Sequence, residues 1–155
     1  MTEFTNDYFK KMHDIGTEYE KARSIRKREK EEFIKNDNWD AVEAWNQREK
    51  NFPFPFCDGS MKAYWAWENS FLSKADFFEV RDLPWEKDAH DFVACLKEAG
   101  ISEFAITDKS TGLMDVLHAF GKEGCQMKGL CTVKRIENNF GTEETKCYNG
   151  ILMSI

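Results

Sequence analysis

Long apolar runs, closely spaced cysteine pairs and an excess of positive charge are all missing from this 155-residue sequence. No stretch reaches the roughly 18 apolar residues of a membrane-spanning helix and no apolar leader opens the chain, so we expect no membrane association. Lys and Arg number 22 against 28 Asp and Glu, and the net charge of −6 disfavours a general attraction to nucleic-acid phosphates.

The cysteines contain no C-x-x-C pair, which removes the commonest signature of a zinc or redox site. An odd set of five suits a reduced compartment, so we expect a cytoplasmic protein whose thiols are core residues. A site combining His118 with Cys125, Cys131 and Cys147 would require the last helix and both tail strands to converge. No close ligand pair supports that convergence, and the sequence predicts neither a metal nor a cofactor.

Proline is also scarce, and two of the three prolines lie in "NFPFPFC" (51–57), which ends a helical N-terminal part. Apolar residues recur three or four apart from Phe4 onward, which predicts a long helix over about 4–33 that Gly16 could interrupt. A second helix is predicted after "NDNWD", with Asp37 as its N-cap. A third helix is predicted to begin at Asp58 or Ser60. Its apolar face is formed by Met61, Tyr64, Trp65, Phe71 and Leu72, with Trp67 lying off that face.

From Asp76 onward the apolar period changes. "DFFEV" and "SEFAIT" predict strands, the segments 89–96 and 113–120 predict helices, and the tail predicts two strands joined by an "ENNFGTEE" loop. The fold class is therefore α+β, with N-terminal helices packed on a small mixed sheet of about four strands in βαβαββ order. We expect a single domain over 1–155, with 1–50 as the helical part and 57–155 as the α/β body, because the helices could not bury their apolar faces alone.

The most site-like stretch is the strand–helix turn at 107–112. Free N–H groups, hydroxyls and a lysine at the start of a helix favour a phosphate or carboxylate, which makes Thr107, Lys109, Ser110, Thr111 and Gly112 candidate anion-binding residues. The spacing matches neither common phosphate-binding motif, and Asp108 adds a negative charge. A simple helix cap by Asp108 or Ser110 explains the same residues.

Two further surfaces are candidates for partner binding. Trp67 with the phenylalanines of the proline segment, such as Phe54, would form an aromatic patch for a protein partner. The basic segment Lys21–Lys30, which contains Arg26 and Arg28, would grip nucleic-acid phosphates, although neighbouring glutamates favour a solvated, ion-paired helix face instead. No pairing of nucleophile with base, and no pair of desolvated carboxylates, indicates an enzyme.

The motifs "DFV..L..AGI", "F.IT..STGLM..LH" and "EGC.M.GLC" lie between Asp91 and Arg135. Over this range the chain resembles a bacterial domain family without an assigned activity, associated with mobile elements. The resemblance implies a small cytosolic α+β domain with no known cofactor. The N-terminal helices lie outside the match, so a binding role specific to this chain could reside there.

Three functions remain open from the sequence. The first is a non-enzymatic cytosolic interaction or regulatory protein that binds a protein partner. The second is a nucleic-acid-associated or anti-restriction-type protein of a mobile element. The third is a protein that binds a small anionic ligand at the turn 107–112.

Overall fold

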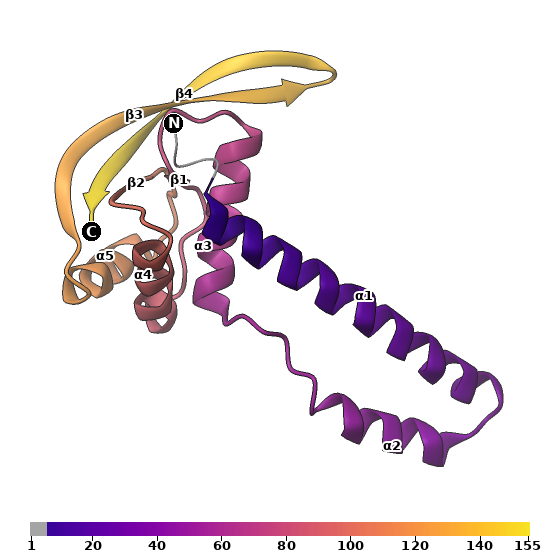
Figure 1. The fold of residues 1–155 in the computed structure, drawn as a ribbon. Helices are drawn as coiled ribbons and strands as arrows, with labels where there is room; N and C mark the ends of the chain where they lie inside the picture. Colours follow the sequence, from indigo (N-terminus) through magenta and orange to yellow (C-terminus); the bar gives the residue numbers. More distant parts are fainter. Residues whose placement is uncertain (1–5) are drawn as a thin grey trace. The chain divides into compact units, whose positions relative to one another are not determined.

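The computed structural model describes residues 6–155 and confirms the α+β fold class (Figure 1). The chain divides into two compact units. The helical unit is Lys11–Phe56, and the sheet unit is Cys57–Ile155 together with residues 6–10. Within the described residues, no helix is both long enough and apolar enough to cross a membrane.

The helical unit contains most of α1 (Asp7–Lys35) and all of α2 (Trp39–Glu49). Helix α1 runs through Gly16 without a break. The predicted N-cap of α2 is wrong, because Asn38 caps that helix with a side chain that accepts from the Ala41 N–H at 3.3 Å. Asp37 has a φ of 53° and terminates α1 instead, since its N–H donates to Ile34 and the following N–H donates to Phe33.

Aromatic side chains make several of the contacts inside the helical unit. The Trp45 indole N–H donates to the Arg26 carbonyl at 2.8 Å, so this ring is held between the two helices. The Tyr19 hydroxyl donates to the Phe52 carbonyl at 3.0 Å, and the Tyr19 ring packs edge-on against Phe54 at 5.2 Å between centroids. The proline segment is therefore fastened to α1 within this unit.

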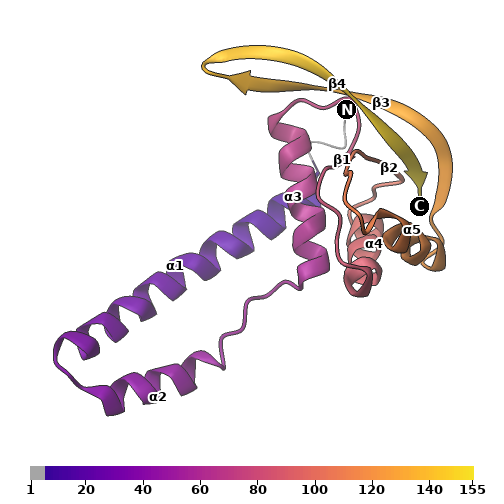
Figure 2. The ribbon, with the colours of Figure 1, turned by 180° about the vertical axis from the view of Figure 1, so that it is seen from behind.

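The sheet unit contains a four-stranded mixed sheet in the order β1-β2-β4-β3. The strands are β1 (Glu79–Val80), β2 (Glu103–Ile106), β3 (Gln126–Asn139) and β4 (Thr142–Ser154). The helices are α3 (Asp58–Leu72), the short 3₁₀ helix η2 (Glu86–Asp88), α4 (Ala89–Glu98) and α5 (Leu113–Lys122). Strands β1 and β2 are parallel and the other pairs antiparallel, which confirms the predicted βαβαββ order. In both views α3, α4 and α5 lie on one side of the sheet (Figures 1 and 2).

Phenylalanine rings fill the space between the sheet and these helices. Phe92 of α4, Phe104 of β2 and Phe120 of α5 contact one another with centroids 5.5–6.0 Å apart. All three are fully buried, and each contributes about 1.5–3 kcal/mol relative to an exposed ring. Gly100, at a φ of 75°, ends α4 and turns the chain into β2.

The predicted apolar face of α3 is wrong in part, since Tyr64 is buried as its position on that face implies but the face extends differently elsewhere. Trp67, which was expected off that face, is only 7% exposed, whereas Phe71 and Leu72 are 46% and 69% exposed. The physical reason is that Phe9, from the first turn of α1, stacks on Trp67 at 5.6 Å and extends the core over a second side of the helix. A neighbour so distant in sequence leaves no mark on the local apolar period.

The β3–β4 hairpin is longer and tighter than predicted. Only residues 151–154 of β4 pair with β2, and beyond them β3 and β4 pair with each other (Figure 2). The strands continue to Asn139 and Thr142, so Phe140 and Gly141 alone make the turn, with φ values of 51° and 85°. The expected eight-residue loop was wrong because its polar residues pair across the exposed ribbon.

Candidate functional site

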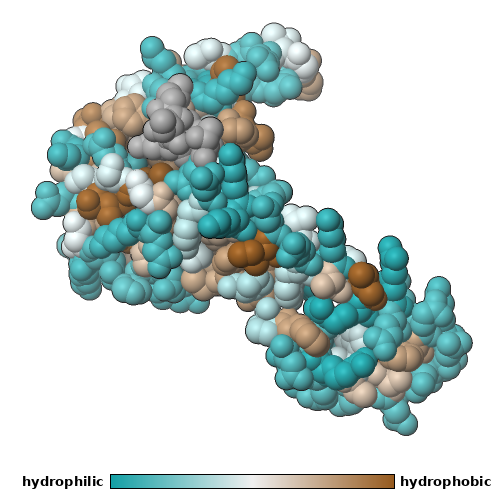
Figure 3. Space-filling model, in the orientation of Figure 1, coloured by the Kyte–Doolittle hydropathy of each residue, from teal (hydrophilic) through white to brown (hydrophobic). Residues whose placement is uncertain are grey.

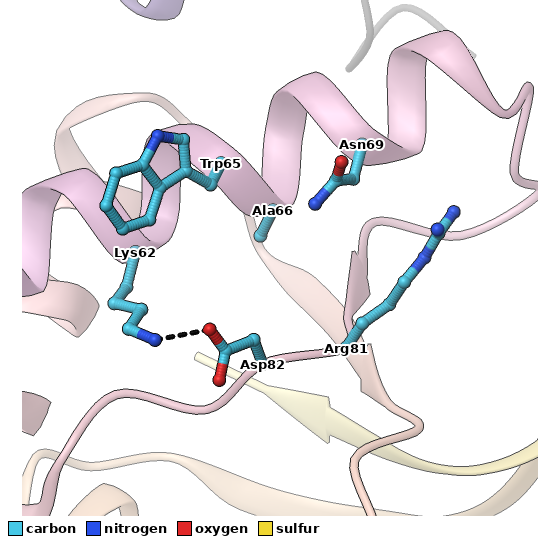
Figure 4. Close-up of a pocket in the computed structure, with 6 residues that line it drawn as sticks. All are labelled: Lys62, Trp65, Ala66, Asn69, Arg81 and Asp82. Atoms are coloured by element: carbon cyan, nitrogen blue, oxygen red, sulfur yellow. Dashed lines mark hydrogen bonds and ion pairs between the residues drawn. The ribbon is translucent and has the colours of Figure 1, made fainter.

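A cleft lies between α3 and the segment that joins β1 to α4. It consists of two pockets of about 200 and 400 Å³ that share Lys62 and Asp82. The smaller pocket is lined by Lys62, Trp65, Ala66, Asn69, Arg81 and Asp82 (Figure 4). The larger pocket adds Leu83, Pro84, Trp85, Glu86, Asp108, Ser110, Thr111, Gly112, Asp115 and Val116. We call both pockets together the tryptophan cleft.

An ion pair stands where the two pockets meet. The Lys62 ammonium on α3 donates to the Asp82 carboxylate, and Figure 4 shows both side chains directed toward one another across the cleft. The Lys62 side chain is 20% exposed, whereas that of Asp82 is 76% exposed. Asp82 therefore remains accessible to other hydrogen-bond donors.

Each pocket has an exposed indole in its lining. Trp65 on α3 is 47% exposed, and Trp85 is 73% exposed. Trp85 follows the buried Leu83 and Pro84 and caps η2, so the main chain around this ring is anchored in the core. Large apolar side chains held at the surface by a rigid backbone are typical of binding sites.

Asp108 joins the turn 107–112 to the wall of the cleft. One carboxylate oxygen accepts from the Leu83 N–H at 2.9 Å, and the other accepts from the Ser110 N–H at 2.7 Å. The predicted cap of α5 by Asp108 or Ser110 is wrong, because the N-cap is Gly112 without a side-chain bond. Asp108 instead holds the loop ahead of the helix, where it occupies an N–H that an incoming anion would need.

The structure separates the five predicted anion-binding residues. Ser110, Thr111 and Gly112 line the larger pocket, and Lys109 is exposed outside its lining. Thr107 points elsewhere and donates its hydroxyl to Glu79 at 2.7 Å. The charged side chains of the larger pocket are Lys62, Asp82, Glu86, Asp108 and Asp115. An anion site at this turn stays a prediction, and this excess of carboxylates disfavours it.

A buried cluster of charges lies behind the cleft. Glu79 is fully buried, and its oxygens accept from Arg81 at 3.1 Å, from Thr107 at 2.7 Å and from Arg135. Arg81 also donates to the Ser73 hydroxyl at 2.7 Å and lines the smaller pocket. We call Glu79, Arg81, Thr107 and Arg135, together with Glu137, Lys146 and Tyr148 around Arg135, the Glu79 cluster. Arg81 connects this cluster to the cleft.

The outer side of the cluster lies on the β3–β4 ribbon. The Arg135 guanidinium lies 3.7 Å from the centre of the Tyr148 ring and pairs with Glu137 at 2.9 Å. Hydrogen bonds from the Tyr148 hydroxyl, Arg135 and Lys146 lower the pKa of Glu137 to about 2. The Glu79 cluster thus spans β1, β3 and β4, and most of its polar atoms bind each other.

The predicted partner residues are divided between the units. Trp67 is in the core of the sheet unit, so its expected exposure is wrong. Phe54, Arg26 and Arg28 belong to the helical unit, where Phe54 is 39% exposed and Arg28 is exposed. Arg26 binds Glu49 at 2.9 Å and lies over the Phe52 ring at 4.4 Å, and hydrogen bonding to Glu49 raises the pKa of Arg26.

The basic segment Lys21–Lys30 directs its charges to different sides of α1. Arg26 pairs with Glu49, and the Lys30 ammonium lies 4.8 Å from the centre of the Trp45 ring, so both turn toward α2. Lys21, Lys27 and Arg28 are exposed. Part of the segment therefore stabilises the helical unit, and the remainder is accessible to solvent.

The thiols and histidines do not converge on a metal-binding geometry. No group of three or more His, Cys, Asp or Glu among residues 6–155 is arranged to hold a metal ion. Burial raises the pKa of the Cys95 thiol to about 11 and also raises those of Cys125 and Cys131. His90 binds Glu123 at 2.8 Å, and this hydrogen bond raises the pKa of the imidazole.

Sequence reasoning missed the residues that build the cleft, above all Lys62, Trp85 and Asp82. One signal was present, because Trp85 stands in the turn "RDLPWEKD" (81–88), outside the predicted strands and helices. The pairing of Lys62 with Asp82 had no signal, since the two residues lie 20 positions apart on different elements.

Residues 62–155 match a family described as a domain of unknown function (DUF7698), and the chain belongs to this family. The match includes every residue of the tryptophan cleft and the Glu79 cluster and leaves out the helical unit. Comparison with curated proteins and with solved structures found no match. The expected resemblance to a domain family without an assigned activity is confirmed over a wider range than residues 91–135.

Proposed function

We propose that this member of the family is a non-enzymatic interaction protein that binds a partner protein through the tryptophan cleft. The observation that carries the proposal is the exposure of Trp65 and Trp85 in adjoining pockets that share the Lys62–Asp82 pair. Tryptophan is enriched among residues that dominate the binding energy of protein interfaces. Two such rings on a rigid frame lose little conformational entropy when a partner covers them.

The polar groups of the cleft support binding over catalysis. The Asp82 carboxylate is paired with Lys62, and both oxygens of Asp108 accept main-chain N–H groups. These contacts shape the cleft and fix the orientation of its walls. A general acid or base requires a carboxyl group that is desolvated and aimed at a reacting atom, and neither residue meets that description.

The cellular setting is part of the same proposal. The resemblance to a bacterial family associated with mobile elements supports a protein of a bacterium or of its plasmids and phages. The cysteines form no disulfide among the described residues, which supports a cytoplasmic location. In that setting the protein would regulate the partner that it binds.

The test is affinity capture from bacterial cytosol followed by a direct binding measurement with the captured partner. The double variant Trp65→Ala/Trp85→Ala should bind that partner at least about tenfold more weakly, since interface tryptophans often contribute 2 kcal/mol or more. The matched control is Leu72→Ala/Met114→Ala, which removes two side chains that are 69% and 65% exposed outside the cleft. Equal affinity of the double variant and the wild type would refute the proposal.

A second candidate function is nucleic-acid binding by the helical unit, which is favoured by the exposed Lys21, Lys27 and Arg28. Phosphate contacts weaken steeply with salt, so duplex or hairpin binding should be measured at low ionic strength. Lys27→Glu/Arg28→Glu should abolish that binding and leave cleft-mediated binding intact. An anti-restriction role would appear instead as inhibition of a nuclease by the wild-type protein.

A further inference from the structure

We infer that the tryptophan cleft binds a segment of its partner that carries arginine or lysine side chains. The inference rests on the proposed function, because it names the chemistry of the partner that the cleft accepts. The inferred ligand is positively charged, whereas the sequence of the turn 107–112 predicted an anion.

The charges that line the cleft are unbalanced. The carboxylates are Asp82, Glu86, Asp108 and Asp115, and the cations are Lys62 and Arg81. The Arg81 guanidinium already has partners, because it donates to the buried Glu79 and to Ser73. Lys62 is paired with Asp82. Glu86, Asp108 and Asp115 then leave the larger pocket with a negative field that attracts a cation.

The exposed indoles suit the same ligand. A guanidinium or ammonium group over a tryptophan face is stabilised by the ring quadrupole, and tryptophan is the best of the aromatic residues for this contact. Trp65 lines the pocket that contains Asn69, whereas Trp85 lines the pocket that contains Glu86 and Asp115. An extended basic segment can place a cation against Trp85 in the larger pocket, where carboxylates outnumber Lys62, and can continue past the Lys62–Asp82 pair toward Trp65.

The main-chain donors argue against an anionic ligand. The Ser110 N–H, which an anion would use, donates to Asp108 at 2.7 Å. An anion in the larger pocket would also lie among four carboxylates and one ammonium. For a phosphorylated or acidic segment, repulsion by the carboxylates would therefore exceed the attraction by Lys62.

Asp82 of the Lys62–Asp82 pair can bind a second cation from a ligand. The Asp82 side chain is 76% exposed and has unoccupied lone pairs, so a guanidinium of the partner can bind it from the solvent side. Lys62 competes with that ligand for the same carboxylate. Replacing Lys62 by methionine should therefore strengthen the binding of a basic segment.

The probe is an acetylated and amidated Arg-Lys-Arg-Lys peptide, titrated into the full chain at low salt. Its counterpart has citrulline at both arginine positions and acetyl-lysine at both lysine positions, which keeps the shape and removes the charge. We expect the basic peptide to bind at least about tenfold more tightly than the neutral one. A third peptide with glutamate at all four positions should not bind.

Substitutions in the cleft test whether the basic peptide binds there. Trp85→Ala and the pair Glu86→Gln/Asp115→Asn should each weaken the basic peptide by at least about tenfold. The matched control is Glu143→Gln/Glu144→Gln on the β3–β4 ribbon, which changes the net charge equally at two exposed positions far from the cleft in sequence. An equal loss in this control would mean that the peptide responds to net charge alone, and the inference would be overturned.

The remaining outcomes separate the two proposals. A cleft that binds the glutamate peptide, phosphate or a neutral sugar in preference to the basic peptide overturns the inferred charge and leaves the cleft as a binding site. Failure of the basic peptide, with partner capture still lost in Trp65→Ala/Trp85→Ala, also overturns this inference alone. Capture that survives the loss of both tryptophans overturns the proposed function as well.

Discussion

The sheet unit holds two charge clusters that share one arginine and have opposite surroundings. In the Glu79 cluster the carboxylate is fully buried and accepts from Arg81, Thr107 and Arg135. In the tryptophan cleft the Asp82 side chain is 76% exposed and has a single ion-pair partner, Lys62. Burial forces a carboxylate to be saturated by its own protein, whereas exposure leaves lone pairs for a ligand.

The comparison assigns different roles to similar residue types. Figure 3 shows a mostly hydrophilic surface with small apolar areas on the face drawn, so a hydrophilic surface alone does not mark a site. The Glu79 cluster joins β1 to the β3–β4 ribbon and stabilises the fold. In the cleft, Trp65, Trp85 and the Asp82 carboxylate are exposed to solvent, which is the basis for proposing it as a recognition site.

The largest expected effect is at Glu79. Replacing it with alanine leaves Arg81 and Arg135 without their buried counter-charge and should destabilise the fold by about 3–5 kcal/mol, as for other broken buried ion pairs. Urea unfolding of the variant and the wild type measures the difference. A decrease in unfolding free energy below about 1 kcal/mol would be typical of an exposed ion pair. The two clusters would then not differ in their contribution to stability.

Thr107 provides the next largest effect. Thr107→Val keeps the shape and removes the hydroxyl that donates to Glu79, which should cost about 1–3 kcal/mol because a buried carboxylate oxygen loses a partner. Thr107→Ser retains the hydroxyl and serves as the control. If valine and serine gave equal stability, the hydroxyl would be irrelevant to Glu79.

Glu137, at the edge of the Glu79 cluster, should make the stability of the fold depend on pH. The pKa of Glu137 is lowered from 4.5 to about 2 by the Tyr148 hydroxyl, Arg135 and Lys146. Its stabilising effect should therefore be complete above pH 4.5 and should decline as the pH falls toward 2. Unfolding of the wild type and Glu137→Gln should converge over that range, with Glu143→Gln as control. Parallel stability curves would contradict the assignment.

The smallest effect is expected in the cleft. A double-mutant cycle with Lys62→Met and Asp82→Asn should give a coupling energy of about 0–1 kcal/mol, because the pair is open to solvent on the Asp82 side. Denaturant unfolding of the four proteins measures this coupling. A value above about 2 kcal/mol would give Asp82 a structural role like that of Glu79.

The sequence predicted the element types wherever local periodicity was strong. The apolar spacing in 113–120 predicted α5, and the alternation after Cys125 predicted the two tail strands. Predictions failed at the ends of elements, where a helix terminus or a turn depends on the backbone conformation of single residues. Asp37 terminates α1 instead of starting α2, and Phe140 occupies a two-residue turn where a glycine or asparagine would be expected.

The candidate site was harder to predict than the fold. The turn 107–112 was identified as site-like, and Ser110, Thr111 and Gly112 do line a pocket. The charge of that pocket was not predictable, since it depends on Asp82 and Glu86 from a segment more than 20 residues earlier. The burial of Trp67 and the exposure of Trp85 were also invisible to the helical period.

By itself, the amino-acid sequence determined the α+β class and the order of elements in the sheet unit, because those follow from apolar periodicity, glycine and proline along a continuous stretch of chain. Tertiary structure alone decided which face of α3 is buried, which carboxylate is saturated and which tryptophans face solvent. The physical reason is that burial depends on neighbours brought from elsewhere in the chain: Glu79 meets Arg135 across 56 residues, and Trp67 is covered by Phe9.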